Sequence, residues 1–299
     1  MQFEPQEGMS PQELVGWYKY AERKGYGYAL RSDHLLPIRT GAADSPECWT
    51  SLGMIAVSTK TIRFGTMVTP ISYRNPALLA KMARTINTLS NGRLIFGLGA
   101  GWYEREYLAY GYEFPNLLTR LERFEEALRI IIPMTIGEKV SHRGRHFSAE
   151  VEALPKSRVY LLIGGRSPRV IKQAAILADE WNIYACSRDR FLKCKKVLGS
   201  VTSGRDIVVS QTGQVVIADS NRDLIRSIKK KMGRSGRSGD PEVEIKRMKD
   251  NGTFCGTPRE LVSQVNERRE LGIDRFYLEV ADKKTKEMAD LLTETLKGA

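Results

Sequence analysis

Histidine is the side chain whose charge changes near neutral pH, and this chain has only three. His34 follows Asp33 in the stretch RSDHLLP, directly after an apolar run that is typical of a strand. An imidazole at a strand end can donate or accept a proton, and the adjacent carboxylate can orient the ring or bind a ligand. In the alternative interpretation, Asp33 caps a turn and His34 bonds the backbone. For His142 and His146, in SHRGRHF, we expect structural or surface roles.

Alternating glycines follow a second strand-like run, RLIF, in the stretch GLGAGWYEREY over residues 97–107. A dinucleotide fingerprint needs G-x-G-x-x-G after the first strand, with an acidic residue about 20 positions later. Here the spacing is G-x-G-x-G on about the fourth strand, and the bulky Trp102 follows the last glycine. The pattern therefore argues against a dinucleotide turn. Glycines at a strand end also let the backbone approach a flat ligand closely.

A glycine pair follows the apolar run VYLLI, giving Gly164-Gly165-Arg166-Ser167 before a helix that begins with proline. Backbone N–H groups at a helix N-terminus favour an anion, and Arg166 adds positive charge. We expect a cofactor phosphate at this loop. The alternative is an ordinary turn between a strand and a helix.

Composition limits the class of protein. The 299 residues are 41% hydrophobic and 27% charged, a balance typical of a globular chain with a core. No apolar run approaches the roughly 18 residues that span a bilayer, and the N-terminus lacks a signal-peptide pattern. The four cysteines, Cys48, Cys186, Cys194 and Cys255, form no CxxC pair, so neither a disulfide framework nor a zinc site is indicated. We expect a reduced, cytoplasmic protein without a metal.

The net charge of +12 raises the possibility of nucleic-acid binding. The densest basic tract, RSIKKKMGRSGRSG over Arg226–Gly239, mixes Lys and Arg with Gly and Ser. Such a tract is typical of a solvated loop, and no aromatic-rich strand of the RNA-recognition type accompanies it. We therefore expect a small-molecule substrate as the partner, and neither nucleic acid nor a membrane.

Strand and helix signals alternate along the chain. Ser10-Pro11-Gln12-Glu13 is a capping box with proline at the first helical position, and Thr257-Pro258-Arg259-Glu260 repeats this signature. Apolar periodicity predicts the elements that such signals bound. The expected helices are 10–25, 46–57, 75–89, 120–132, 168–178, 257–271 and 285–296, and the expected strands are 26–30, 61–68, 93–99, 159–165, 180–185, 206–217 and 274–280.

Strict alternation predicts a parallel sheet, because parallel strands need crossover connections. About eight strands over this length fit a closed (β/α)8 TIM barrel, an α/β fold. A doubly wound sheet would predict a change in composition between the halves of the chain, which is not seen. We expect one barrel domain over residues 1–299, with insertions at about 137–157 and 233–256.

The chain resembles a known family in the segment GRLIFGLGAGWYEREYLAYGYEF, which is similar to the hallmark segment of the luciferase-like oxidoreductases. That superfamily includes flavin-dependent enzymes of the bacterial luciferase type and deazaflavin (coenzyme F420)-dependent enzymes. Further similar segments follow in the family's order, namely RSDHLLP, Ile62–Arg93, Leu161–Asn182 and Gly256–Val280. The resemblance spans almost the whole chain and implies a bacterial luciferase-like barrel.

The resemblance also implies roles for individual residues. It places the Asp33-His34 pair near the reactive part of the cofactor ring. It implies a non-proline cis peptide under that ring within GTMVTP, expected at Val68–Thr69 with Met67–Val68 as the alternative. The implied catalytic residues are His34, Asp33 and Glu104, and the implied cofactor-binding residues are Asp33, Met67, Val68, Thr69, Gly101, Tyr103, Gly164, Gly165, Arg166 and Ser167. Relatives often have Asn where Tyr103 stands, and Glu104 and Glu106 could instead cap a helix.

The identity of the cofactor decides between hydride transfer and oxygen activation, because a deazaflavin does not readily activate oxygen. The form of the segments is most similar to the F420-dependent branch, which implies hydride transfer to or from a small organic substrate that the sequence does not identify. The alternatives are an FMN-dependent monooxygenase and a non-catalytic flavin-binding barrel. The resemblance also implies a homodimer that packs through early helices, where Ala77, Ala80 and Ala83 would permit close approach.

Overall fold

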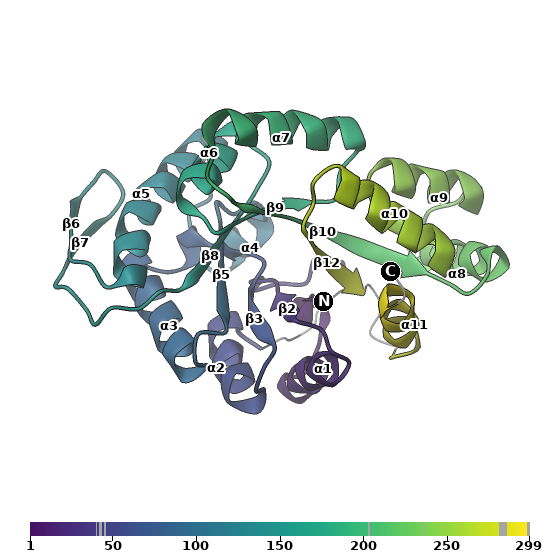
Figure 1. Cartoon of the computed structure of the whole chain (residues 1–299), viewed down its shortest axis with the longest axis horizontal. Helices are drawn as coiled ribbons and strands as arrows, with labels where there is room; N and C mark the ends of the chain where they lie inside the picture. Colours follow the sequence, from purple (N-terminus) through teal and green to yellow (C-terminus); the bar gives the residue numbers. More distant parts are fainter. Residues whose placement is uncertain are drawn as a thin grey trace.

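A computed structural model of the chain describes residues 1–39, 41, 44, 46–202, 204–234, 236–280 and 286–297. Eight parallel strands close into a barrel, because β12 pairs with β1 and β9 pairs with β10 (Figure 1). In order around the barrel they are β1 (Gln2–Phe3), β2 (Tyr28–Arg31), β3 (Arg63–Thr66), β5 (Leu94–Gly99), β8 (Tyr160–Gly164), β9 (Glu180–Tyr184), β10 (Val208–Ile217) and β12 (Arg275–Val280). The predicted TIM barrel is confirmed.

Helices surround the barrel on its outer side (Figure 1). They are α1 (Pro11–Arg23), α2 (Cys48–Ser58), α3 (Pro76–Leu89), α5 (Leu117–Ile136), α6 (Pro168–Leu177), α7 (Arg188–Thr202), α8 (Asn221–Arg234), α9 (Pro241–Asp250), α10 (Pro258–Glu270) and α11 (Lys286–Lys297). The short helix α4 (Glu104–Ala109) follows β5 at the carboxyl end of the barrel. The short 3-10 helices are η1 (Pro5–Glu7) and η2 (Ile71–Tyr73), and the two-residue strand β4 (Thr69–Pro70) pairs with β5.

Local sequence signals account for many of these boundaries. The backbone N–H of Glu13 donates to Ser10 Oγ at 3.2 Å, and the Ser10 N–H donates to Glu13 Oε2 at 2.7 Å, which is the predicted capping box. The box at Thr257 also forms, with its N–H 2.8 Å from Glu260 Oε2. The predicted strand boundaries lie within two residues of the observed ones. Strand β1 escaped prediction because it is only two residues long.

The loop predicted over Arg226–Gly239 is wrong for its first nine residues, which belong to helix α8. Leu224, Ile228 and Met232 recur every fourth residue, and their buried faces pack against Met248 and Val216. This apolar stripe stabilises the helix, while the intervening lysines dominate its composition. Position 235 lies outside the described residues. Helices α7 and α9 were not predicted either.

The two expected insertions contain regular structure. Within 137–157, β6 (Val140–Arg143) and β7 (Ser148–Val151) form an antiparallel hairpin. Glu126 of α5 holds this hairpin, accepting hydrogen bonds from the Phe147 N–H at 2.7 Å and the His146 N–H at 3.0 Å, and lying 3.2 Å from His142 Nε2. The structural roles expected for His142 and His146 agree with these contacts. Within 233–256, β11 (Phe254–Gly256) pairs with the last three residues of β10.

The barrel interior is filled at the amino ends of the strands. Glu180 and Arg275 form a buried ion pair there, and the hydroxyl of Tyr160 donates to Glu180 Oε2 at 3.1 Å. Arg275 also bonds the hydroxyl of Tyr28 at 3.1 Å. Leu30, Ile95, Leu162 and Tyr277 form an apolar cluster. These contacts close the barrel interior at its amino end.

The small residues on α3 pack inside the protein. Ala80 and Ala83 are fully buried and belong to the main core, so they do not form an external surface. The reason given for a dimer interface on this helix is therefore wrong, although the helix also exposes Leu78.

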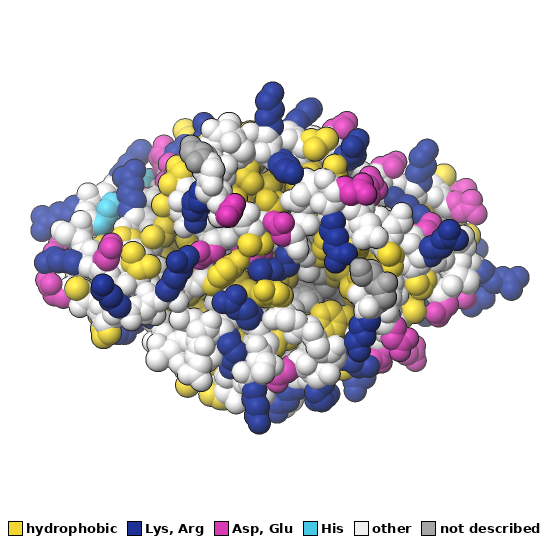
Figure 2. Space-filling model, in the orientation of Figure 1, with side chains coloured by type: hydrophobic (Ala, Val, Ile, Leu, Met, Phe, Trp, Pro, Cys, Tyr) yellow, Lys and Arg dark blue, Asp and Glu magenta, His cyan; other side chains and the backbone are white. Residues whose placement is uncertain are grey.

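Charge is dispersed on the surface. Figure 2 shows Lys and Arg side chains spread over one face of the molecule and interleaved with Asp and Glu.

In the part of the chain that the structure describes, no helix has the length and apolar character to cross a bilayer.

Candidate functional site

Glu106 of α4 holds His34 in place. The ring nitrogen Nδ1 of His34 lies 2.8 Å from Glu106 Oε1, and the backbone N–H of Leu35 donates to Glu106 Oε2 at 2.9 Å. The His34 side chain is 12% exposed and that of Glu106 is buried. Because His34 follows β2 and α4 follows β5, the pair lies at the carboxyl end of the barrel, where active sites of this fold are found.

Tyr73 of η2 donates a hydrogen bond to the same oxygen, Glu106 Oε1. The ring of Tyr73 stacks on that of Tyr112, with centroids 5.3 Å apart, and the Tyr112 hydroxyl donates to the Tyr73 carbonyl at 3.1 Å. Three groups from separate segments, the His34 ring, the Leu35 N–H and the Tyr73 hydroxyl, therefore share one buried carboxylate. This arrangement fixes the orientation of the imidazole.

The environment favours a protonated His34. Burial lowers the pKa of His34, but the hydrogen bond and the negative charge of Glu106 outweigh it, so the pKa is raised above the ordinary value of 6.5. Burial, followed by the bond to Glu106, raises the pKa of Tyr73, so its hydroxyl stays protonated and acts as a donor. Glu106 therefore stabilises the protonated form of His34.

Asp33 does not contact His34. Its carboxylate accepts hydrogen bonds from Arg74 Nη1 at 2.7 Å and from the Thr69 hydroxyl at 2.9 Å. Trp49 Nε1 in turn donates to the Thr69 hydroxyl at 3.1 Å. These contacts join the segments after β2 and β3 to α2, so Asp33 and Thr69 are buried supports beneath the site. Glu106, rather than Asp33, orients the ring.

Sequence reasoning selected Glu104 for a catalytic role, and the structure brings Glu106 to His34 instead. Glu104 is the first residue of α4 and is exposed, whereas Glu106 is fully buried. Residues two apart on a helix point to different sides, so only one of the two can face the barrel. Burial distinguishes the two glutamates, and it follows from the tertiary structure and not from a local sequence signal.

The segment after β3 forms a shelf across the barrel mouth. The Met67–Val68 peptide bond is cis, so the expected position Val68–Thr69 was wrong and the alternative was right. The Val68 side chain lies over the ends of β5 and β8, where a Cβ at Gly99 would be 2.5 Å from Val68 Cγ2 and one at Gly164 would be 2.9 Å from Val68 Cγ1. These glycines therefore make room for Val68, which is half-buried.

Structural contacts also account for three residues at the end of this stretch, Gly101, Trp102 and Tyr103. Gly101 has a φ of +78°, and a Cβ there would lie 1.8 Å from the Tyr107 hydroxyl. Next to it, the rings of Trp102 and Tyr103 meet the His34 ring edge-on, with centroids 5.6 and 5.9 Å away. The Tyr103 hydroxyl donates to the Pro37 carbonyl at 3.2 Å, which ties down the segment after His34.

The loop after β8 has the features of an anion site. Gly165 donates its N–H to the Asn182 carbonyl at 3.1 Å, and Ser167 caps α6 by accepting from the Val170 N–H at 3.3 Å. Among the described residues, no protein atom accepts a hydrogen bond from the backbone N–H of Arg166 or Ser167. These two amides and the exposed Arg166 side chain can therefore receive a phosphate.

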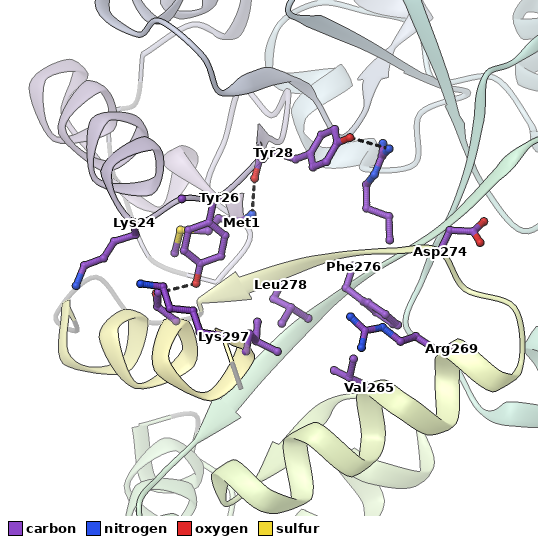
Figure 3. A pocket seen from close by; sticks show the side chains of 15 residues that line it. Met1, Lys24, Tyr26, Tyr28, Val265, Arg269, Asp274, Phe276, Leu278 and Lys297 are labelled. Carbon is purple, nitrogen blue, oxygen red and sulfur yellow. Dashed lines mark hydrogen bonds between the residues drawn. The ribbon is translucent and has the colours of Figure 1, made fainter. Parts of the chain in front are cut away.

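A separate cavity of about 340 Å³ lies at the opposite, amino end of the barrel strands (Figure 3). Its polar groups include the Met1 amine, which donates to the Tyr28 carbonyl at 2.8 Å, and the Tyr26 hydroxyl, 2.9 Å from Thr293 Oγ1. Burial lowers the pKa of the Met1 amine to about 5. Because residues at this end of a barrel serve stability, we do not place the chemistry here.

A closed parallel barrel with its candidate site at the carboxyl ends of the strands defines the class of (β/α)8-barrel proteins. Residues 2–275 match the family model of the luciferase-like monooxygenases, and the chain belongs to this family.

Two curated relatives and one solved structure illustrate the similarity. The F420-dependent glucose-6-phosphate dehydrogenase of Microbacterium testaceum is 29% identical over 202 residues, which cover 66% of this chain and 60% of the relative. The F420-dependent hydroxymycolic acid dehydrogenase of Mycobacterium tuberculosis is 31% identical over 198 residues, covering 64% of this chain and 55% of the relative. The chain thus spans less than two thirds of the length of either relative.

The solved structure is an F420-dependent secondary alcohol dehydrogenase in complex with an F420–acetone adduct. It superposes with a TM-score of 0.77 at 20% identity, covering 98% of this chain and 97% of the other. At this identity the likeness shows a shared fold.

Proposed function

We propose that this chain is an oxidoreductase that uses coenzyme F420 for hydride transfer to or from a small organic substrate. The observation that carries the proposal is the buried His34–Glu106 pair at the barrel mouth, which also holds the Val68 shelf and the anion-binding loop. The names of the two curated relatives, both F420-dependent dehydrogenases, support the choice of cofactor.

The residues present fit such a cofactor. Val68 and the glycines beneath it present an apolar surface on which a flat ring can lie. The amides of Arg166 and Ser167, together with the Arg166 guanidinium, would hold a phosphate. When bound, a deazaflavin supplies two-electron hydride chemistry, and the protein supplies binding, orientation and proton transfer.

His34 performs the proton transfer in this proposal. Its Nδ1 is engaged by Glu106, so Nε2 is the ring atom that faces a substrate oxygen. Because the pKa of His34 is raised, the ring holds a proton more firmly than a free imidazole does, and the protonated ring can donate it as a carbonyl is reduced. In the reverse direction the neutral ring accepts the proton of an alcohol. Glu106 stabilises the imidazolium in both directions.

Cofactor titration followed by turnover tests the proposal. We expect the purified protein to bind F420, followed by its fluorescence, more tightly than FMN, and to transfer hydride with a panel of small alcohols and carbonyls. His34→Gln should lower turnover by about 10²–10⁴-fold with little change in F420 affinity. His142→Gln is the matched control, because His142 lies in the hairpin outside the site, where it contacts Glu126 of α5.

Other outcomes identify the alternatives. Preferential FMN binding with consumption of oxygen would show a monooxygenase. Flavin binding without turnover of any panel member, and without an effect of His34→Gln, would support a non-catalytic barrel.

We further propose that the protein is a homodimer that packs through its early helices. The support is the exposure of apolar side chains there, with Val57 of α2 68% exposed and Leu78 of α3 56% exposed. A monomer mass in light scattering at micromolar concentration would contradict it.

A cytoplasmic location is likewise proposed, supported by four buried cysteines that all have free thiols.

A further inference from the structure

A cavity of about 470 Å³ lies on the outer side of the barrel between α7 and α10, away from His34. Gln211 of β10 forms part of its wall. Ser210 and Thr212, on either side of Gln211, bond Asn182 on the neighbouring strand. Because alternate residues of a strand point to opposite faces, Gln211 points outward, towards the helices.

Two buried polar atoms of this cavity lack partners. Gln211 is 2% exposed, and its Oε1 accepts no hydrogen bond from a described residue. Arg268 of α10 lies against the same cavity, and its buried Nη1 has no acceptor among the described residues. Buried groups of this kind usually have a partner, since leaving one unpaired costs about 1–3 kcal/mol. A ligand in this cavity would therefore need an acceptor for Arg268 Nη1 and a donor for Gln211 Oε1.

Arg268 is held in place without a carboxylate. Its Nη2 donates to the Gly252 carbonyl at 2.8 Å, and its guanidinium lies 3.8 Å from the centre of the Phe254 ring. No described carboxylate forms an ion pair with it. Burial lowers the pKa of Arg268 to about 10, which is still high enough for a positive charge at neutral pH. An anionic acceptor would compensate this charge best.

The charged residues at the rim of the cavity do not indicate the charge of a ligand. They are of both signs, and Lys249 is already paired with Glu260 at 2.7 Å. The other charged rim residues are exposed to solvent, which screens them, namely Arg188, Asp189, Asp250 and Glu267. Selection therefore rests on Arg268 and Gln211 inside.

Two aromatic residues, Trp181 and Phe191, connect the cavity to the anion-binding loop. Trp181 Nε1 donates to the Gly165 carbonyl of that loop at 2.9 Å, and the Trp181 ring is parallel to that of Phe191 within 14°, with centroids 6.4 Å apart. Phe191 lines the cavity, as does Cys186. Cys194, one turn along α7 from Phe191, has its thiol 3.9 Å from the Arg166 carbonyl. A ligand anchored by its phosphate at the loop could continue into the cavity.

We propose that this cavity binds the γ-glutamyl tail of the deazaflavin cofactor, an inference that rests on the proposed function. A tail carboxylate accepts a hydrogen bond from Arg268 Nη1, and a tail amide N–H donates to Gln211 Oε1. The tail is attached beyond the cofactor's phosphate, and Trp181 and Phe191 connect the loop that would hold this phosphate to the cavity. Its chemistry supplies the acceptor and the donor that the two buried atoms lack.

Binding of two cofactor forms tests this site. Affinities of F420 with its glutamates, and of the phosphate-containing form without glutamates, are measured by fluorescence titration of the intact protein. In the wild type we expect the tailed form to bind at least about tenfold more tightly, as one charge-assisted bond predicts. Arg268→Met should remove this preference and leave the affinity of the tail-less form unchanged. Arg269→Met, on the same helix but outside the cavity, is the control.

Equal affinity of the wild type for the two forms would overturn the tail site and leave the proposed function standing. So would an equal loss for both forms in Arg268→Met. Failure of the wild type to bind either form would instead overturn the proposed function, and the tail site with it. The wild-type comparison needs no variant, so the test holds even where Arg268→Met does not fold.

Discussion

Replacing Glu106 by glutamine removes the negative charge beside His34. Glu106→Gln keeps the size of the side chain, but its single amide oxygen can replace only one of the two carboxylate oxygens, of which Oε1 accepts from the Tyr73 hydroxyl and Oε2 from the Leu35 N–H. It removes the negative charge 2.8 Å from His34 Nδ1. The burial of the ring, which disfavours the imidazolium, remains in the variant.

The expected magnitude follows from that single bond. A hydrogen bond to a charged partner contributes about 1.5–3 kcal/mol, and about 1.4 kcal/mol corresponds to a factor of ten. The affinity of the His34 ring for its proton should therefore fall by about ten- to a hundredfold. With burial left as the main influence, we expect the pKa of His34 to move down from its raised position.

An NMR titration of the histidine rings measures this directly, because the chain has only three histidines. Glu126→Gln is the matched control, since Glu126 contacts His142 at 3.2 Å and lies outside the site. It should leave the titration of His34 unchanged. An unchanged His34 midpoint in Glu106→Gln would refute the reasoning that the Glu106 charge holds the proton.

The same pair predicts how stability depends on pH. The pKa of folded His34 lies above the unfolded value of 6.5, so the bound proton stabilises the fold fully below pH 6.5. This contribution is lost as the pH rises through the folded pKa. The difference in unfolding free energy between wild type and Glu106→Gln should therefore be larger below pH 6.5 than at alkaline pH, as measured by urea unfolding. A difference that grows with pH would contradict the assignment.

Three other predictions concern the supports of the site. Gly99→Ala places a Cβ 2.5 Å from Val68 Cγ2 and should destabilise the protein by about 1–3 kcal/mol in thermal unfolding. Val68→Ala should partly restore the stability of this variant, and absence of such a rescue would exclude the clash as the cause. Glu180→Ala leaves the half-buried Arg275 without its carboxylate partner and should lower the unfolding free energy by about 1–3 kcal/mol, whereas an unchanged urea midpoint would show that the pair is dispensable. Arg166→Ala should weaken F420 binding by about 1.5–3 kcal/mol without changing the melting temperature, and equal affinity in titration would remove Arg166 from the phosphate site.

The fold was predictable because its signals are local. Capping boxes at Ser10 and Thr257 involve residues three apart, and amphipathic periods repeat within one helix or strand. Alternation of strands and helices then restricts the topology to a parallel sheet, and the chain length favours closure. The prediction of a loop in place of helix α8 was wrong for a local reason. The lysine-rich composition is typical of a loop, whereas the apolar residues at every fourth position indicate a helix.

The amino-acid sequence alone determined the barrel, its family resemblance, His34 as the candidate proton carrier and the glycine pair before α6. Only the tertiary structure decided which carboxylate serves His34, because Glu106 is 72 residues away in the chain and reaches it through closure of the barrel. It also decided that Asp33 bonds Arg74 and Thr69, and that Gly99 makes room for Val68. Such contacts join segments from different strands, and their geometry depends on how the strands pair and twist around the barrel. No signal within one segment carries that information.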